Sequence, residues 1–313
     1  MFFPTAGITV DPWIPPLVAF GISFFTSMAG VSGAFLLLPF QMSFLGFTSP
    51  SVSATNHLFN IVAIPSGVYR YLKEGRMVWP LAWVVILGTL PGVIVGAVVR
   101  VAYLPDPANF KGFAALVMLY IGGRMVWDLA RGRNGRQDRA AAERRFQDLV
   151  RNRGDACGAG AAVSVRRMNL REIAFCFHGE EFVIHTPGIF ALSFGVGIVG
   201  GIYGIGGGSI IAPFFVAVYG LPVYIVAGAA LMGTFVTSIA GVVFFQAIAP
   251  IYPEMSVSPD WLLGILFGLG GMAGMYFGAR CQKHVPARVI KWMLVAIILF
   301  TAFKYLRAFI AGL

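Results

Sequence analysis

The amino-acid sequence predicts an all-α polytopic membrane protein made of two inverted repeats. Each repeat is a re-entrant or broken helical hairpin followed by three transmembrane helices, and a cytoplasmic loop joins the two. Three observations support this prediction. The 313 residues are 58% hydrophobic and only 12% charged, whereas soluble domains carry about 25% charge. Apolar runs of about 20 residues, the length that crosses a hydrocarbon core of about 30 Å, recur along the chain. The two halves also share a pattern of glycines and prolines.

Composition also excludes several classes of function. The net charge of +10 would suit a nucleic-acid-binding protein, but the basic residues lie between apolar runs and form no basic face with interleaved aromatic rings. The sequence contains no Walker motif and no paired intramembrane acids. Its three cysteines, Cys157, Cys176 and Cys281, have no metal-ligand spacing. We therefore expect no nucleic acid, no enzyme activity, no metal and no cofactor, and all three cysteines reduced.

Apolar runs bounded by charges, prolines or glycine clusters define the predicted domains. Two runs are long, at residues 13–47 and 186–221, and six are of ordinary length, at about residues 51–69, 78–99, 110–126, 223–247, 261–279 and 289–309. Between the halves, residues 131–185 hold 11 of the 23 basic and 7 of the 13 acidic residues. The prediction is an N-terminal membrane repeat (1–130), an Arg-rich cytoplasmic loop (131–186) and a C-terminal membrane repeat (187–313). Within the loop we expect a short helix over 131–153 and a β-hairpin over 174–185.

The two membrane repeats are predicted to be an internal duplication. A shift of 174 positions places Gly30 on Gly204, Gly33 on Gly207 and Pro39 on Pro213. The same shift aligns seven further identical residues, namely Phe20, Gly21, Phe40, Gly46, Val52, Gly67 and Val68 with their counterparts. Six of these ten identities are Gly or Pro, which is more than shared hydrophobicity explains. Such duplications are a common construction of secondary transporters.

The distribution of basic residues orients the repeats. Residues 70–76, the central loop and residues 280–291 are basic, whereas residues 249–260 carry two acids and no Lys or Arg. The three basic segments therefore belong in the cytoplasm. An odd number of crossings must then lie between the central loop and residues 249–260, although two apolar runs occupy that interval.

The long runs resolve this count. Glycines at 200–208 interrupt the second long run and leave flanks of about 15 residues, roughly 22 Å of helix, which is too short to span a membrane. We therefore predict that the long run of each half is a re-entrant pair of half-helices, that the halves are inverted and that both termini lie outside. The alternative is eight full spans in parallel repeats, which puts the basic 70–76 loop and the acidic 249–260 loop on one face.

The interrupted runs also supply the candidate substrate site. The N–H groups in the first turn of a helix have no intrahelical partner and, with the helix dipole, bind anions without a buried cation. These amides belong to Ser32, Gly33 and Ala34 in the first half and to Gly206, Gly207, Gly208 and Ser209 in the second. Glycine permits a positive φ and leaves no side chain between amide and ligand. The alternative is that these glycines only allow close helix packing.

Polar side chains in the following runs complete the predicted site. They are Asn56, His57 and Asn60 in the first half and Thr234 in the second. Asn56 and Asn60 lie four residues apart, on one helical face, and unpaired amides are costly in hydrocarbon. His57 is either a proton carrier or a neutral packing histidine. No Asp or Glu lies deep in a run, so the acidic site of many coupled carriers is missing.

The residues around the second interruption carry a family resemblance. The stretch from Gly197 to Gly208 reads GIVGGIYGIGGG, is followed by Pro213 and continues into AGAALMGT, which ends at Thr234. This pattern resembles the TauE/SafE-type sulfite exporter family, also described as sulfonate-uptake permeases. The first half shares the hydrophobic hairpin and Pro39, but Gly33-Ala34 stands where a longer glycine run is usual.

The resemblance implies a bacterial inner-membrane permease for sulfur-containing anions such as sulfite, thiosulfate or organosulfonates. We therefore predict a multi-pass secondary permease whose partners are the lipid bilayer and a small anionic substrate, held by half-helix N-termini at the repeat interface. The rival is a membrane-anchored sensor or scaffold whose cytoplasmic loop is the functional part. Broken, glycine-rich runs favour the permease because an anchor needs only continuous helices. Each chain supplies two hairpins, so a monomeric transport path is the default, and the sequence leaves the oligomeric state open.

Overall fold

A computed structural model describes the helical core and a small sheet. The described residues are 1–28, 32–73, 77–130, 163–169, 171–177, 180–218, 223–281 and 287–310. After a two-stranded pair, β1 (Phe2–Phe3) and β2 (Ile8–Thr9), the first half forms α1 (Ile14–Met28), α2 (Ala34–Ser43), α3 (Ser51–Lys73), α4 (Trp79–Ala102) and α5 (Pro107–Ala130). The second half forms α7 (Thr186–Tyr203), α8 (Gly207–Val218), α9 (Val223–Ile248), the 3₁₀ helix η1 (Ala249–Ile251), α10 (Trp261–Cys281) and α11 (Ala287–Ile310).

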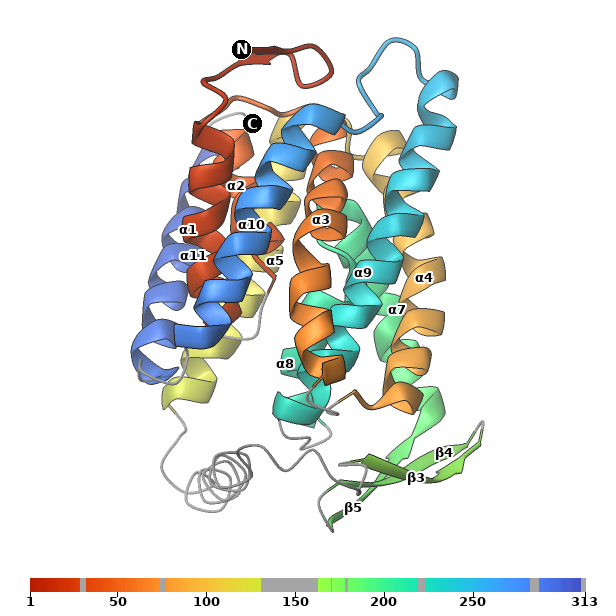
Figure 1. Cartoon of the computed structure of the whole chain (residues 1–313). Coiled ribbons are helices and arrows are strands. Elements are labelled where there is room, and N and C mark those ends of the chain that lie inside the picture. Colours follow the sequence, from red (N-terminus) through yellow and green to blue (C-terminus); the bar gives the residue numbers. More distant parts are fainter. Residues whose placement is uncertain are drawn as a thin grey trace.

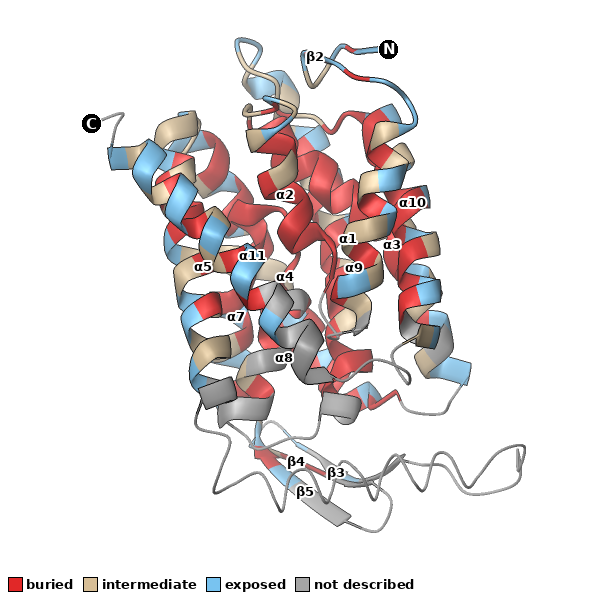
Figure 2. Ribbon diagram, turned by 90° about the vertical axis from the view of Figure 1, so that its left-hand side faces the viewer, coloured by how far each residue is buried: buried red, intermediate tan, exposed pale blue. Residues whose placement is uncertain are grey.

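The helical core is that of an all-α membrane protein, as predicted. Among the described residues, five helices are long and apolar enough to cross a membrane by length and composition, namely α4, α5, α7, α9 and α10. Their outward faces expose large apolar side chains, such as Trp83 and Leu87 of α4, while the buried residues face the middle of the bundle (Figure 2). α7 has 18 residues and is long enough to cross a membrane by length and composition. The expectation of a flank of about 15 residues, too short to span, was therefore wrong on this side of the interruption.

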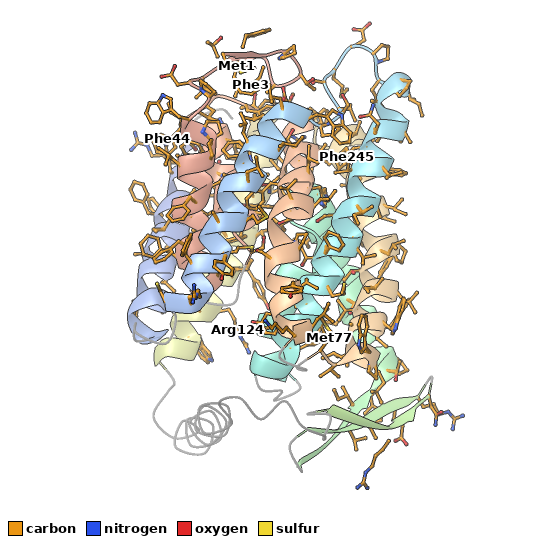
Figure 3. The ribbon with its side chains drawn as sticks, in the orientation of Figure 1. Met1, Phe3, Phe44, Met77, Arg124 and Phe245 are labelled. Atoms are coloured by element: carbon orange, nitrogen blue, oxygen red, sulfur yellow. The ribbon has the colours of Figure 1, made fainter. Side chains whose placement is uncertain are left out.

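Each long run folds into a pair of helices, and the two pairs start from opposite ends of the bundle. Both termini lie at one end, and α1 starts there while α2 leads back toward it (Figure 1). α7 starts at the other end, beside the sheet, and α8 leads back toward the sheet. Figure 3 marks the two ends, with Phe44, which follows α2, and Phe245 toward the termini and Met77 and Arg124 toward the sheet. α1, α2 and α8 have 15, 10 and 12 residues.

The helix contacts pair the two halves reciprocally. α4 packs on α7 as α10 packs on α1, and α3 packs on α10 as α9 packs on α4. The remaining large interfaces join α5 to α11 and α3 to α9. Exchanging α1–α5 with α7–α11 in order therefore reproduces these six interfaces.

Glycines spaced four apart make the first of these pairs possible. Gly88, Gly92 and Gly96 of α4 lie against α7, where a Cβ atom built on Gly92 would lie 2.9 Å from the Cα of Gly197. On α10, three glycines take the corresponding place against α1, namely Gly270, Gly274 and Gly278. Without side chains at these positions the backbones approach closely, as in other membrane helix pairs.

These glycines also mark a second internal offset. A shift of 182 positions places Trp79 on Trp261 and the three glycines of α4 on those of α10. This offset exceeds the first by 182 − 174 = 8 residues, because the connection that contains η1 is longer than its counterpart before α4. A single offset therefore hides the correspondence of α4 with α10.

The described part of the central loop is a sheet. β3 (Val163–Met168), β4 (Glu172–Phe177) and β5 (Glu180–His185) are antiparallel in the order β3-β4-β5, and β5 leads directly into α7. The pair β4–β5 lies where the sequence predicts a hairpin, and β3 is an additional strand. The helix expected over 131–153 lies outside the described residues.

Replacing Gly92 by Ala tests the close approach of α4 and α7. The added methyl group would overlap the carbonyl oxygen of Phe194, and overpacking of this kind costs about 1–3 kcal/mol, against a gain of about 1 kcal/mol in helix propensity. The melting temperature of the purified protein in detergent should fall. Gly195→Ala is the matched control, because nothing lies within 4 Å of its Cβ, and it should melt at or above the parent temperature. Equal melting of both variants would contradict the packing assignment.

Candidate functional site

The link between α7 and α8 is built from glycines in the left-handed region. The N–H groups of Gly204 and Ile205 both donate to the carbonyl oxygen of Gly200, at 2.9 and 3.0 Å, and so end α7. Gly204 and Gly206 have φ values of +78° and +71°, which other residues rarely adopt. α8 then begins at Gly207, so its first-turn N–H groups have no acceptor within their own helix.

At the start of α2, the first amide bonds to a nearby side chain. The N–H of Ala34 donates to Ser32 Oγ at 3.3 Å, and the N–H groups of Leu36 and Leu37 donate to the carbonyl oxygen of Gly33. The N–H of Ala34 can therefore donate to an anion only if the side chain of Ser32 moves to another rotamer. Residues 29–31, with Gly30, lie outside the described residues.

Asn60 joins the two interruptions. Ser32 Oγ donates to Asn60 Oδ1 at 2.7 Å, and Asn60 Nδ2 donates to the carbonyl oxygen of Ile205 at 3.1 Å. Ser53, two turns earlier on α3, donates to the carbonyl oxygen of Ile202 at 3.0 Å. One buried amide thus holds the start of α2 and the α7–α8 link together, although these segments are about 170 residues apart in the chain.

Asn56 forms a second polar bridge, within the first half. Its Nδ2 donates to the carbonyl oxygen of Ala34 at 3.0 Å, and its Oδ1 accepts a hydrogen bond from Gln41 Nε2 at 3.4 Å. Gln41 is fully buried, and within the described part of the chain its Oε1 has no hydrogen-bond partner. Sequence reasoning overlooked Gln41, although it is the one amide side chain within α2.

His57 and Thr234 lie differently from the asparagines. His57 Nδ1 is 3.3 Å from Ser238 Oγ on α9, and no described residue forms a hydrogen bond with its buried Nε2. His57 thus faces α9 rather than the start of α2. The hydroxyl of Thr234 donates to the carbonyl oxygen of Ala230, on its own helix, at 2.9 Å, while its methyl group lies beside Gly206.

The glycines at the start of α8 pack closely against their neighbours. A Cβ atom on Gly207 would lie 2.5 Å from Cγ2 of Thr89, and one on Gly208 would overlap the carbonyl oxygen of Ala230. Ser209 lies in the first turn of α8, and its side chain lies outside the described residues. Close helix packing requires glycine here, and so does an anion site made of backbone amides. The interpretation as a packing site and the interpretation as an anion site are therefore compatible.

Two tyrosines hold α2 in place. Pro39 lies inside α2 and has no N–H, which leaves the carbonyl oxygen of Phe35 without its usual helical donor. The hydroxyl of Tyr203, at the end of α7, donates to that oxygen at 3.2 Å. The hydroxyl of Tyr305, on α11, donates to the carbonyl oxygen of Pro39 at 3.2 Å. Sequence reasoning missed both tyrosines, although a proline inside an apolar helix signals a free carbonyl oxygen.

The chemistry of this junction is that of neutral hydrogen-bonding groups. Its side chains are amides and hydroxyls, and the first-turn N–H groups of α8 have no acceptor within their own helix. Among the described residues no three His, Cys, Asp or Glu side chains are grouped to hold a metal ion. The arrangement can bind an anion through N–H and O–H donors.

Comparisons with known proteins agree with the resemblance in the sequence. The family model described as sulfite exporter TauE/SafE matches residues 16–305, from α1 to the last turns of α11. No curated protein and no solved structure gives a significant match.

The bond between Tyr203 and the freed carbonyl oxygen predicts a coupling between two substitutions. Tyr203→Phe leaves the oxygen of Phe35 buried and unpaired, which should lower the free energy of unfolding by about 1–3 kcal/mol. In a Pro39→Ala background the new backbone N–H can reach that oxygen, so the same substitution should cost less than about 1 kcal/mol. Chemical denaturation of the four proteins of this cycle measures the difference. Additive costs would show that Tyr203 acts only through ring packing.

Proposed function

The chain belongs to the sulfite exporter TauE/SafE family, a family of membrane transporters of sulfur-containing anions, and we propose that it is a secondary permease for a small sulfur oxyanion. Sulfite, thiosulfate and organosulfonates are the candidate substrates, and the bacterial inner membrane is the proposed location. The small anion and the surrounding lipid are the proposed partners.

The observation that carries this proposal is the double hydrogen bond of Asn60. It brings the start of α2 and the α7–α8 link, one from each half of the chain, to the same buried point. Broken backbone within an apolar bundle is tolerated where it lines a cavity or is covered by protein, and transporters place substrate at such breaks. A scaffold with a working cytoplasmic loop needs neither feature, and the family does not favour it.

We propose that the two halves are inverted repeats related by an approximate two-fold axis in the membrane plane. The reciprocal helix contacts and the two offsets of 174 and 182 residues support this relation. The α1–α2 and α7–α8 pairs, which start from opposite ends of the bundle (Figure 1), are then re-entrant hairpins that enter from opposite sides.

The substrate is proposed to sit between these hairpins. The first-turn amides of Gly207, Gly208 and Ser209 hold one face of the oxyanion, and Ser32 and Asn60 approach the other. Each hydrogen bond to the charged ligand contributes about 1.5–3 kcal/mol. Ser32 bonds Ala34 and Asn60 while no anion is bound and exchanges those bonds for the ligand. Asn56 and Gln41 line the path on the side toward the termini, and His57 and Thr234 line it along α9.

The membrane potential sets the proposed direction of transport. No Asp or Glu lies in the interior of the predicted spans, so an anion moves without an acidic coupling site. A potential of 100 mV, negative inside, favours outward movement of one negative charge by about 2.3 kcal/mol. We therefore propose export, and His57 remains the candidate for any coupled proton.

Binding titrations test the site. Purified protein should bind at least one of sulfite, thiosulfate and taurine more tightly than sulfate. Gly206→Ala should weaken that binding about tenfold or more, because its methyl group would lie 3.0 Å from Thr234 Cγ2 and a positive φ costs other residues about 1–2 kcal/mol. Gly7→Ala is the control, since Gly7 has a φ of +67° with nothing within 4 Å of its Cβ and should bind as the parent does. Absence of binding to every anion would refute the proposed function.

Thiol labelling tests the inverted arrangement. In a protein without its native cysteines, Glu254→Cys and Asn169→Cys place one exposed thiol at each end of the bundle. A membrane-impermeant reagent added to intact cells should label Glu254→Cys alone, because residues 249–260 lack basic side chains and the loop that contains Asn169 is rich in them. Labelling of both thiols from outside would support parallel repeats instead.

A further inference from the structure

A fully buried arginine lies at the end of α4, on the side of the bundle where the termini lie. Arg100 has no solvent exposure, and its guanidinium carbon lies 3.9 Å from the centre of the Phe110 ring. Nη1 donates to the carbonyl oxygen of Leu104, and Nη2 donates to that of Thr48 at 3.3 Å. The third nitrogen, Nε, is buried and has no hydrogen-bond partner among the residues that the structure describes.

None of the carboxylates that the structure describes neutralises the charge of Arg100. Within the described part of the chain its acceptors are neutral carbonyl oxygens, and no carboxylate forms an ion pair with it. A guanidinium has five N–H donors, and removal of such a cation from water without an opposite charge costs several kcal/mol. The cation–π contact with Phe110 offsets part of that cost. Ser49, next to Thr48, also has a buried hydroxyl that bonds to none of the described residues.

A row of neighbouring aromatic rings leads from Arg100 to the candidate site. The Phe110 ring that faces Arg100 lies 6.5 Å from the ring of Tyr203, which ends α7. Tyr203 in turn stacks on Phe35, in the first turn of α2, at 5.7 Å. The unpaired Oε1 of Gln41 belongs to the same short helix. The uncompensated cation is therefore two aromatic rings away from the start of α2.

We propose that Arg100 is a second anion-binding site, which takes the substrate oxyanion at the terminus-side end of the transport path. An oxyanion supplies the missing negative charge, and its oxygens match the planar fork formed by Nε and Nη2. The carbonyl oxygen of Thr48 occupies Nη2 in this structure and is displaced by the anion. This assignment rests on the proposed function, because it takes the same sulfur oxyanion as the junction around Asn60.

A purely structural role for Arg100 predicts a different outcome. Its bond to Leu104 lies at the C-terminal end of α4, where a cation stabilises the helix dipole, and its bond to Thr48 holds the α2–α3 connection. Loss of those contacts would lower stability and leave the affinity of the folded protein for anions unchanged. Affinity and stability must therefore be measured on the same variants.

Calorimetric titration of the purified full chain with sulfite and with thiosulfate tests the proposal. Arg100→Gln removes the charge and keeps a donor for the carbonyl oxygens, and it should weaken binding of the preferred anion about 10- to 150-fold. Arg100→Lys keeps the charge but not the fork, and it should weaken binding less than Arg100→Gln. Arg307→Gln is the matched control, because Arg307 is exposed near the end of α11, and it should bind as the parent does.

The possible outcomes separate this inference from the proposed function. If the parent binds and Arg100→Gln binds equally well, Arg100 is structural and only this inference fails. If Arg100→Gln does not fold, Arg100→Lys decides, and parental affinity in that variant overturns the proposal. If the parent binds neither anion, the proposed function fails and Arg100 loses its substrate.

Discussion

A chain that breaks its helices inside an apolar bundle must find partners for the peptide groups that the breaks release. In this protein those partners come largely from other helices. Asn60 of α3 accepts a hydrogen bond at the first interruption and donates one at the second, where Ser53 of α3 also donates. Tyr203 of α7 donates to the carbonyl oxygen that Pro39 leaves free in α2. The breaks in one half are thus stabilised by side chains from the other, which ties the halves into one unit.

The sequence predicts the breaks better than it predicts the side chains that stabilise them. Glycine clusters and an interior proline are local signals, so the α7–α8 link and the short α2 can be recognised from composition and spacing. Asn56 and Asn60 stand out because amides are rare in apolar helices. Which face they occupy depends on the packing of α3 between α9 and α10, so nothing local distinguishes them from His57, which faces α9. Gln41, Tyr203 and Arg100 act through contacts with distant segments, and such contacts leave no short-range pattern.

Two kinds of anion recognition follow from the same fold. Neutral donors at the junction around Asn60 bind an anion less tightly than a buried positive charge would, which suits a site that must also release its ligand. A buried guanidinium attracts anions more strongly and selects planar arrangements of oxygens. In the proposed export, the glycine amides of α8 bind the anion at the break, and Arg100 then binds it at the outer, terminus-side end of the path.

The position of a bound anion decides between this account and its rivals. Selenite has the shape and charge of sulfite, and selenium gives a strong anomalous signal in X-ray diffraction from crystals of the complex. We expect an anomalous peak between the first turn of α8 and Asn60, with its oxygens about 3 Å from the amides of Gly207 and Gly208. A peak confined to the β3–β5 sheet or to the protein surface, with the junction empty, would show that the two breaks are structural and that the transported anion passes elsewhere.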